Sequence, residues 1–95
     1  WDETLAAFAT AAGDRIDVMV NNAGIGTGGM LAELDPDEID RCLDINLKGV
    51  LYGAQAAYPY LRKTAPGSAL INMASAAGIA ASAGMSVYCA TKFGV

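Results

Sequence analysis

Tyr88 and Lys92 stand four residues apart in the stretch YCATK, a spacing that places two side chains on the same face of a helix. A free tyrosine has a pKa near 10 and is therefore a poor base at pH 7. A lysine ammonium about 6 Å away, at an effective dielectric constant of about 20, favours the ionised tyrosine by roughly 3 kcal/mol, or about two pKa units. Lys92 is the only charged side chain after Lys63, so no sequence neighbour within this chain neutralises it.

Two further polar residues fall where a polar side chain needs an explanation. Asn46 shares the apolar face of a predicted helix with Leu47 and Val50. An unpaired buried amide there costs about 1–3 kcal/mol, so we expect Asn46 to have a hydrogen-bond partner. Ser75 ends a predicted strand and precedes Tyr88 by 13 residues.

The turn formed by Asn22, Ala23 and Gly24 also follows a predicted strand. Ligands of open α/β sheets bind in the crevice at the carboxyl ends of the parallel strands. This turn and Ser75 are therefore candidates for one ligand site.

Each candidate also has a purely structural explanation when it is taken alone. Ser75 could cap a turn, Tyr88 could be a half-buried core aromatic, and Lys92 could be a solvated helix charge. Cys89, beside Tyr88, is explained by packing within the helix. Backbone geometry alone could account for four glycines, namely Gly24, Gly26, Gly28 and Gly29.

Short apolar runs and helical spacing predict the elements that carry these residues. Residues 3–12 read as an amphipathic helix that Gly13 ends. The run RIDVMV, residues 15–20, predicts a strand buried on both faces, as in a parallel sheet. The run SALINMAS, residues 68–75, predicts a second buried strand.

A clear helix start lies at Asp35, which suits the N-cap position. Pro36 would be the first helical residue, and Glu38 falls where it would close a capping box. The apolar pattern that follows fits one long helix or two helices joined near residues 44–46. A last helix is predicted from Ser86, with Ser86 as its cap.

The predicted order of helix, strand, helix, strand, helix is typical of an α/β fold with a parallel sheet and right-handed crossovers. Two strands are too few for a stable sheet of this class. We therefore expect both ends of the chain to lie within a larger domain.

Gly24, Gly26 and Gly29 have the spacing of a dinucleotide-binding glycine loop, G-x-G-x-x-G. In that motif the third glycine lies in the first turn of a helix, and an acidic residue about 20 positions on holds the ribose. Here the next helix start is Asp35, six residues beyond Gly29, and position 49 is a glycine. Both requirements fail, which favours another explanation of the stretch.

Four elements in order resemble the classical short-chain dehydrogenase/reductase family, whose members are Rossmann-fold oxidoreductases that use NAD or NADP. They are NNAG at 21–24, DINLKG with Asn46, the serine Ser75, and the Tyr-x-x-x-Lys pair of Tyr88 and Lys92. Many members have two serines where this chain has Ala74 and Ser75, and the 13-residue separation still selects Ser75. The resemblance implies that residues 1–95 are the central part of a single NAD(P)-binding domain, truncated at both ends.

The resemblance also implies a role for each residue. Tyr88 would be the general acid/base, and Ser75 would hydrogen-bond the substrate oxygen. Tyr88 and Lys92 would also bind the cofactor, and Lys92 would lower the tyrosine pKa and hold the nicotinamide ribose. Asn46 would support a water leading to Lys92. The cofactor's adenosine side would lie against three residues of the NNAG turn, Asn22, Ala23 and Gly24.

Composition narrows the alternatives. The net charge is −4 with no cluster of Lys or Arg, which argues against a nucleic-acid partner. The stretch between Lys63 and Lys92 lacks charges but is rich in Ala, Gly and Ser, which argues against a membrane span. Without histidine the chain offers neither a Cys/His zinc site nor a Ser-His-Asp triad. Cys42 and Cys89 form no CxxC motif and fit reduced thiols of a cytoplasmic protein.

We therefore expect an oxidoreductase that transfers a hydride between NAD(P) and a small alcohol or carbonyl substrate. The family resemblance also implies a homo-oligomer, a tetramer or a dimer. One alternative is a non-catalytic dinucleotide-sensing domain of the same fold. Another concerns the isolated chain, which we expect to be inactive and to bind no dinucleotide tightly, because the family's phosphate loop would precede residue 1.

Overall fold

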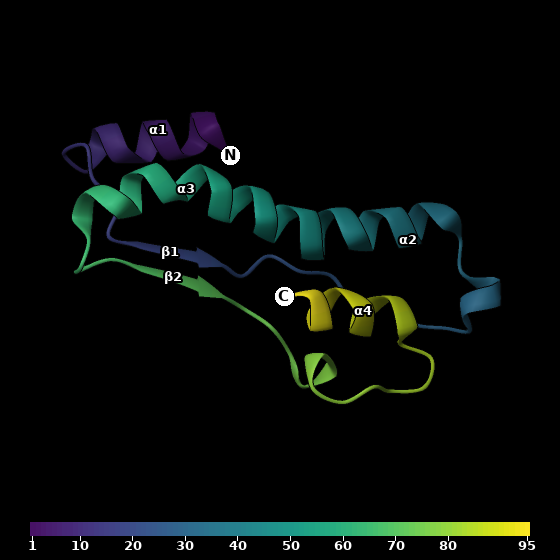
Figure 1. Ribbon diagram of the computed structural model, residues 1–95. Helices are drawn as coiled ribbons and strands as arrows, with labels where there is room; N and C mark the ends of the chain where they lie inside the picture. The colour runs from purple at the N-terminus through teal and green to yellow at the C-terminus, as the bar shows by residue number, and fades with distance from the viewer.

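The computed structural model of the chain describes all 95 residues. They form an elongated body of 49 × 25 × 15 Å, in which a long helical run lies along two strands (Figure 1). The regular elements are α1 (Asp2–Ala11), β1 (Val18–Asn21), the short 3-10 helix η1 (Leu31–Glu33), α2 (Pro36–Leu43), η2 (Asp44–Lys48), α3 (Gly49–Thr64), β2 (Ala69–Asn72), the 3-10 helix η3 (Ala76–Gly78) and α4 (Ser86–Gly94).

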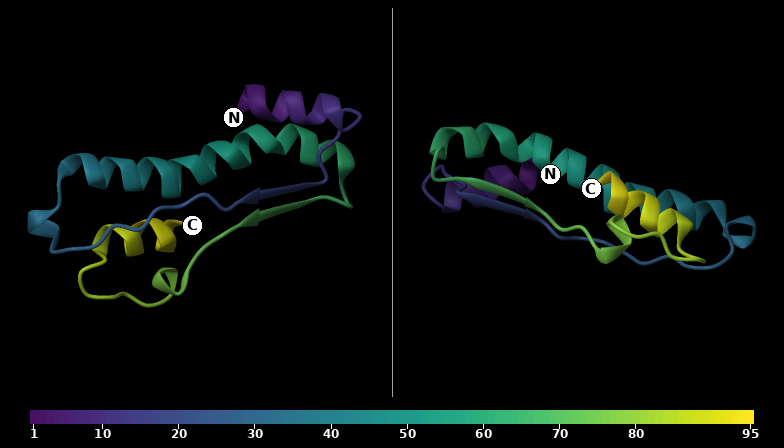
Figure 2. Two further views of the ribbon diagram at one scale, coloured as in Figure 1. Left: turned by 180° about the vertical axis from the view of Figure 1, so that it is seen from behind. Right: turned by 60° about the horizontal axis from the view of Figure 1, so that its bottom comes forward.

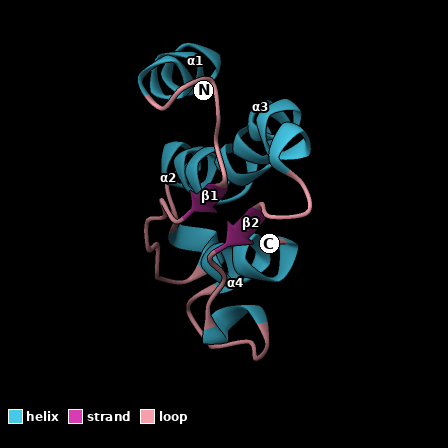
Figure 3. Ribbon diagram, turned by 90° about the vertical axis from the view of Figure 1, so that its left-hand side faces the viewer, coloured by secondary structure: helices cyan, strands magenta, loops and turns pink.

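The two strands are parallel and pair in register from Val18 with Ala69 to Asn21 with Asn72. The chain passes between them through α2 and α3, as a parallel pair requires. Helices α1 and α3 lie on one side of the strands, and α4 lies past the strand tips on the other side (Figures 1 and 3). The predicted parallel α/β arrangement is confirmed.

The strands are shorter and more exposed than the sequence predicts. Residues 15–17, 68 and 73–75 lie outside the strands. Val18 and Val20 are 53% and 47% exposed, and all four residues of β2 are exposed. The prediction of burial on both faces was therefore wrong for these residues. Val18 and Val20 share the face of the sheet that no element of the chain covers. The core on the other face packs on β1 through Met19 and contains no residue of β2, so β2 is exposed on both faces.

The core lies between α1, α3 and β1. Leu5 and Ala9 of α1 meet Met19 of β1 and Leu61 of α3, with Ile16 and Ala57 completing the cluster. Burying one such aliphatic side chain contributes about 1.5–3 kcal/mol, so this cluster is what fixes α1 and α3 against the strands.

Helix ends follow local chemistry in two of three predicted cases. Gly13 has φ +72°, and the Asp14 amide donates to the Ala9 carbonyl at 2.7 Å, which ends α1 in a Schellman arrangement. Asp35 caps α2, because its Oδ1 accepts from the Asp37 amide at 2.9 Å. The return bond of a capping box, from the Glu38 side chain, is absent. Ser86 is the first residue of α4, and Met85 holds the N-cap position without a side-chain bond, so the predicted Ser86 cap was wrong.

The long helical run resolves the choice between one helix and two. α2 and α3 are continuous through η2, five residues of π-helix that contain Asn46. A π-bulge inserts an extra residue into the helical repeat and is frequent at functional sites. Asn46 therefore lies at the π-helical turn of this run and contacts α4 through Thr91.

Candidate active site

The segments that follow β1 and β2 run on past the carboxyl ends of the strands, where α4 also lies (Figures 1 and 2). The segment after β1 carries Gly24, which lies beside Lys92 of α4. The segment after β2 carries Ser75, and its Met73 carbonyl accepts a hydrogen bond from Lys92. Parallel strands end at the same edge of a sheet, so the residues that follow them are brought together there.

Asn46 is fully buried, at 0% exposure, and both ends of its amide have partners. Its Oδ1 accepts from the Ile25 amide at 2.8 Å, and its Nδ2 donates to the Ile25 carbonyl at 2.8 Å. Nδ2 also lies 3.2 Å from the Thr91 hydroxyl and 3.5 Å from the Cys42 sulfur. The expectation of a hydrogen-bond partner is confirmed, and Asn46 joins the segment after β1 to α4.

Lys92 is a buried lysine, at 6% exposure. Its Nζ donates to the Met73 carbonyl at 3.1 Å and lies 5.8 Å from the centre of the Tyr88 ring. The explanation of Lys92 as a solvated helix charge is therefore wrong. No carboxylate forms a salt bridge with it, since the two salt bridges of the chain join Arg15 to Asp17 and Lys48 to Asp44.

Gly24 lies directly beside these two side chains. A Cβ added to Gly24 would stand 3.4 Å from both Asn46 Oδ1 and Lys92 Nζ. Asn22, Ala23 and Gly24 are all exposed and follow β1 directly. The turn therefore presents open backbone next to the lysine ammonium.

Ser75 is half-buried and lies three residues beyond the end of β2. Its Oγ accepts from the Ala77 amide at 3.2 Å and caps η3. The hydroxyl therefore has a structural bond, and its own hydrogen is free to donate. Gly78, at the end of η3, packs on α4, where a Cβ would stand 2.5 Å from the Lys92 carbonyl oxygen.

Tyr88 is half-buried on α4, and its hydroxyl makes no hydrogen bond within the chain. The Tyr88 backbone carbonyl accepts from the Thr91 hydroxyl at 2.7 Å. The tyrosine hydroxyl is thus free to bond another molecule.

Sequence reasoning missed Thr91 and Cys42, which both contact Asn46. The sequence held a signal for Cys42, which precedes Asn46 by one helical turn, but none for Thr91, which is 45 positions from Asn46. Burial raises the pKa of the Cys42 thiol, while the Thr91 hydroxyl and the charge of Lys92 act in the opposite direction.

Asn21, the first residue of NNAG, has a structural position. Its Nδ2 donates to Asn72 Oδ1 at 2.9 Å across the strand pair and to the Val50 carbonyl of α3 at 3.2 Å. It therefore ties both strands to the helix. Its Oδ1 is buried without a partner and lies where a Cβ on Gly53 would be.

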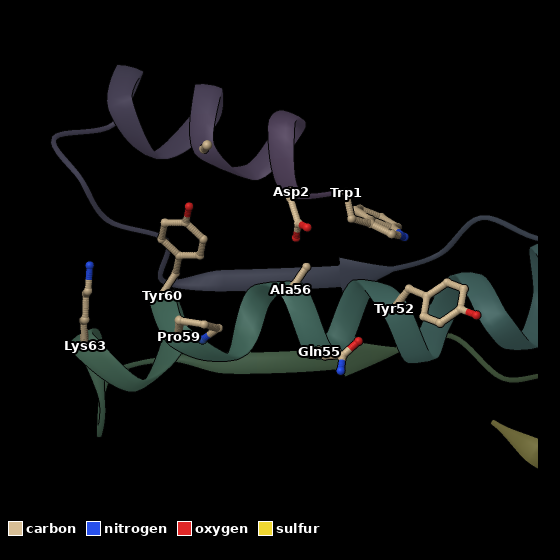
Figure 4. A pocket seen from close by; sticks show the side chains of 9 residues that line it. Trp1, Asp2, Tyr52, Gln55, Ala56, Pro59, Tyr60 and Lys63 are labelled. Carbon is tan, nitrogen blue, oxygen red and sulfur yellow. The ribbon is translucent and has the colours of Figure 1, made fainter.

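A hollow of about 790 Å³ opens elsewhere, between α1 and α3 (Figure 4). Trp1, Tyr52, Tyr60 and Lys63 are among the residues that line it. It contains none of the candidate residues.

The chain has no group of three His, Cys, Asp or Glu side chains that could hold a metal ion. Each helix is too short or too polar to cross a membrane.

Comparisons with known proteins agree with this arrangement. A model of the short chain dehydrogenase family matches residues 2–95. A crystal structure of a short chain dehydrogenase from Mycobacterium smegmatis superposes with a TM-score of 0.89 at 36% identity, over 99% of this chain and 39% of that one. The fold is therefore part of a Rossmann-type parallel α/β domain. The chain belongs to the short chain dehydrogenase family.

Two relatives illustrate the range of similarity. An uncharacterized oxidoreductase of Staphylococcus saprophyticus is 46% identical over 96 residues, which cover 99% of this chain and 39% of the relative. A diacetyl reductase of Staphylococcus aureus that forms (S)-acetoin is 40% identical over 78 residues, 82% of this chain and 30% of the relative. The chain thus spans about two fifths or less of the length of these relatives.

Proposed function

We propose that residues 1–95 form the central part of a single NAD(P)-binding domain, in an oxidoreductase that transfers a hydride between NAD or NADP and an alcohol or carbonyl substrate. The observation that carries the proposal is the buried Lys92 ammonium, set beside the Tyr88 ring, the Gly24 turn and the fully bonded Asn46 in a chain of this family.

The surroundings of Lys92 fit a dinucleotide ribose. An ammonium group has three N–H donors, and only one is used, by the Met73 carbonyl. Two donors are left for hydroxyl groups, and Gly24 leaves the space next to Nζ free of a side chain. Asn22 and Ala23 extend this open turn, where the adenosine side would lie. When bound, the dinucleotide supplies the hydride for carbonyl reduction or accepts it from an alcohol.

Tyr88 is the proposed general acid/base. In reduction its hydroxyl gives its proton to the substrate oxygen as the carbonyl becomes an alcohol, and in oxidation it takes that proton back. The Lys92 ammonium lies 5.8 Å from the centre of the Tyr88 ring, on the same face of α4.

Ser75 is the proposed hydrogen-bond donor to the same substrate oxygen. Its Oγ lone pair accepts from the Ala77 amide, which fixes the hydroxyl and leaves its hydrogen for the substrate. A donor held in place before the reaction stabilises the developing charge without reorganisation.

Asn46 is the proposed support of a water path to Lys92. Both ends of its amide are occupied by protein groups. Its contribution is therefore to fix the position of the Ile25 segment and of α4, between which such a water would lie.

The proposal extends to the whole protein in three further respects. The substrate is a small molecule, as the name of the diacetyl reductase relative illustrates for that protein. The protein is a homo-oligomer, a tetramer or a dimer. The protein is cytoplasmic, since Cys42 and Cys89 are free and buried, which suits the reducing conditions of that compartment.

The test is the consumption of NADH and NADPH by the full-length protein with a panel of small ketones and aldehydes that includes diacetyl. We expect turnover with at least one pair, and a loss of about 10²-fold or more in Ser75→Ala. Ser82→Ala, at an exposed serine without a side-chain bond, is the matched control and should keep its turnover. Tight binding of NAD(P)H with no turnover of any compound would instead favour a non-catalytic dinucleotide-sensing domain.

A further inference from the structure

Thr91 connects two of the proposed site residues through one hydroxyl group. It is fully buried, at 0% exposure, and lies on α4 between Tyr88 and Lys92. Its Oγ accepts a hydrogen bond from Asn46 Nδ2 at 3.2 Å and donates one to the Tyr88 carbonyl at 2.7 Å. A hydroxyl has one hydrogen, so these two bonds fix its orientation.

The hydrogen bonds of the Asn46 amide depend on this hydroxyl. The amide nitrogen has two hydrogens, and the Ile25 carbonyl at 2.8 Å takes one of them. The second has two neighbours, the Thr91 oxygen and the Cys42 sulfur at 3.5 Å, and sulfur is a weak acceptor. Without the hydroxyl, a buried N–H of Asn46 would have only the sulfur.

The connection continues from Asn46 to the turn after β1. Asn46 holds the Ile25 backbone by both its amide and its carbonyl. Ile25 directly follows Gly24, where a Cβ would stand 3.4 Å from Lys92 Nζ. A shift of Asn46 therefore changes where the turn lies relative to the lysine and the tyrosine.

We propose that Thr91 is a positioning residue of the active site, which sets α4 with Tyr88 and Lys92 against the cofactor-facing turn through the Asn46 amide. It touches neither substrate nor cofactor. This inference rests on the proposed function for its effect on turnover, whereas the connection from Thr91 to Ile25 belongs to the chain alone.

Thr91→Val and Thr91→Ser form a matched pair of variants. Valine keeps the shape and loses both hydrogen bonds, whereas serine keeps the hydroxyl and loses a methyl group. Thr91→Ala also removes the hydroxyl and places no methyl group where the hydroxyl was. It gives the same comparison should the valine variant fail to fold.

The first readout needs no activity. The Ile25 amide hydrogen is bonded to Asn46 Oδ1, so its exchange with deuterium in the dinucleotide-free protein reports how firmly Asn46 is held. We expect exchange at the Ile25 amide to be faster in Thr91→Val and unchanged in Thr91→Ser. Exchange at the backbone amides of α1 should be unchanged in both variants. An unchanged Ile25 rate in Thr91→Val would overturn the proposal.

The second readout uses the carbonyl compound that the full-length protein reduces fastest. We expect kcat to fall about 10–100-fold in Thr91→Val, because misplacement by a fraction of an ångström to 1 Å costs rates of this order, and to stay within about threefold in Thr91→Ser. The kinetic isotope effect with NAD(P)H deuterated at the transferred position should rise in Thr91→Val. A lower kcat with both the isotope effect and the Ile25 exchange rate unchanged would mean a smaller folded fraction and would also overturn the proposal.

Tyr88→Phe, measured in parallel, distinguishes failure of the proposed function from failure of the inference about Thr91. Full turnover in Tyr88→Phe would contradict the proposed function, and the Ile25 exchange rates would then decide the Thr91 connection alone. An inactive Tyr88→Phe together with a Thr91→Val that matches the wild type in kcat, isotope effect and exchange would overturn only the inference about Thr91.

Discussion

The Nζ atom of Lys92 donates a hydrogen bond to the Met73 carbonyl oxygen at 3.1 Å. This bond joins α4 to the segment that leads from β2 to Ser75. Lys92 as a whole is 6% exposed, and its ammonium group has no carboxylate partner. Burying an unpaired charge costs free energy, so Lys92 lowers the stability of the fold while it serves the proposed chemistry.

Lys92→Met tests this conflict between stability and activity. Methionine fills much of the same volume without charge, and Met73 is exposed, so water can replace the lost donor. We expect the free energy of unfolding in urea to stay within about 1 kcal/mol of the wild type or to rise, and turnover to fall about 100-fold or more. Lys63→Met is the matched control, because Lys63 is exposed and lies 5.7 Å from the Tyr60 ring, nearly the same geometry outside the site. A marked loss of stability in Lys92→Met would show that the ammonium is a structural group.

Gly78→Ala tests the contact between η3 and α4. The added Cβ would stand 2.5 Å from the Lys92 carbonyl oxygen and 2.9 Å from its carbon, and backbone cannot move aside cheaply. We expect the free energy of unfolding to fall by about 1–3 kcal/mol and kcat to fall with it, because Ser75 directly precedes η3 and caps it. Gly26→Ala is the control, since a Cβ there meets nothing within 4 Å. Equal stability of the two variants in urea would contradict the packing described.

Gly53→Ala and Gly49→Ala should change stability in opposite directions, although both glycines lie in α3. At Gly53 a Cβ would overlap the buried Asn21 Oδ1 and stand 3.1 Å from Trp1, so we expect a loss of about 1–3 kcal/mol despite the better helix propensity of alanine. At Gly49 the nearest atom is the Asp44 carbonyl oxygen at 3.5 Å, an ordinary contact, so we expect a gain of up to about 1 kcal/mol. Thermal unfolding of both variants checks the signs, and a stabilised Gly53→Ala would contradict the position of Asn21.

Cys42 should make stability depend on pH in the alkaline range. Burial raises the pKa of its thiol, so above about pH 8.5 the unfolded chain loses a proton that the folded chain keeps. The unfolded state then binds fewer protons, and the free energy of unfolding falls as the pH rises towards the raised pKa, whereas below the unfolded pKa this contribution is constant. Urea unfolding at pH 7 and at about pH 9.5 measures the fall.

Cys42→Ala is the control for that measurement, because every other titrating group is common to both proteins. We expect the fall between the two pH values to be smaller in Cys42→Ala than in the wild type. Equal falls would mean that the Cys42 thiol titrates alike in the folded and unfolded chain.

Local chemistry explains which features could be predicted from the sequence. Asp35 and Pro36 mark the start of α2 because a cap and a fixed φ act within a few residues. Asn46 could be predicted to have a partner because an amide on an apolar face needs one. The partner itself, the Ile25 backbone, could not be predicted, since backbone groups carry no sequence signal.

Features that depend on the assembled chain were harder to predict. The apolar runs of β1 and β2 indicated strands, but Val18 and Val20 are exposed, because hydrophobicity does not say which element covers a face. Thr91 looked like any helix residue before Lys92, and its importance follows from a contact with Asn46, 45 positions away. The burial of Lys92 likewise depends on the Met73 and Gly24 segments that follow two different strands.

Turnover of the full-length Tyr88→Phe variant tests the central claim most directly. Phenylalanine keeps the ring beside Lys92 and removes only the hydroxyl that is proposed to carry the proton. With the best carbonyl compound and saturating NAD(P)H, we predict a kcat about 10²–10⁴-fold below that of the wild type, and a dinucleotide affinity that is little changed. A Tyr88→Phe protein that reduces the substrate at the wild-type rate would contradict the assignment of Tyr88 as the general acid/base.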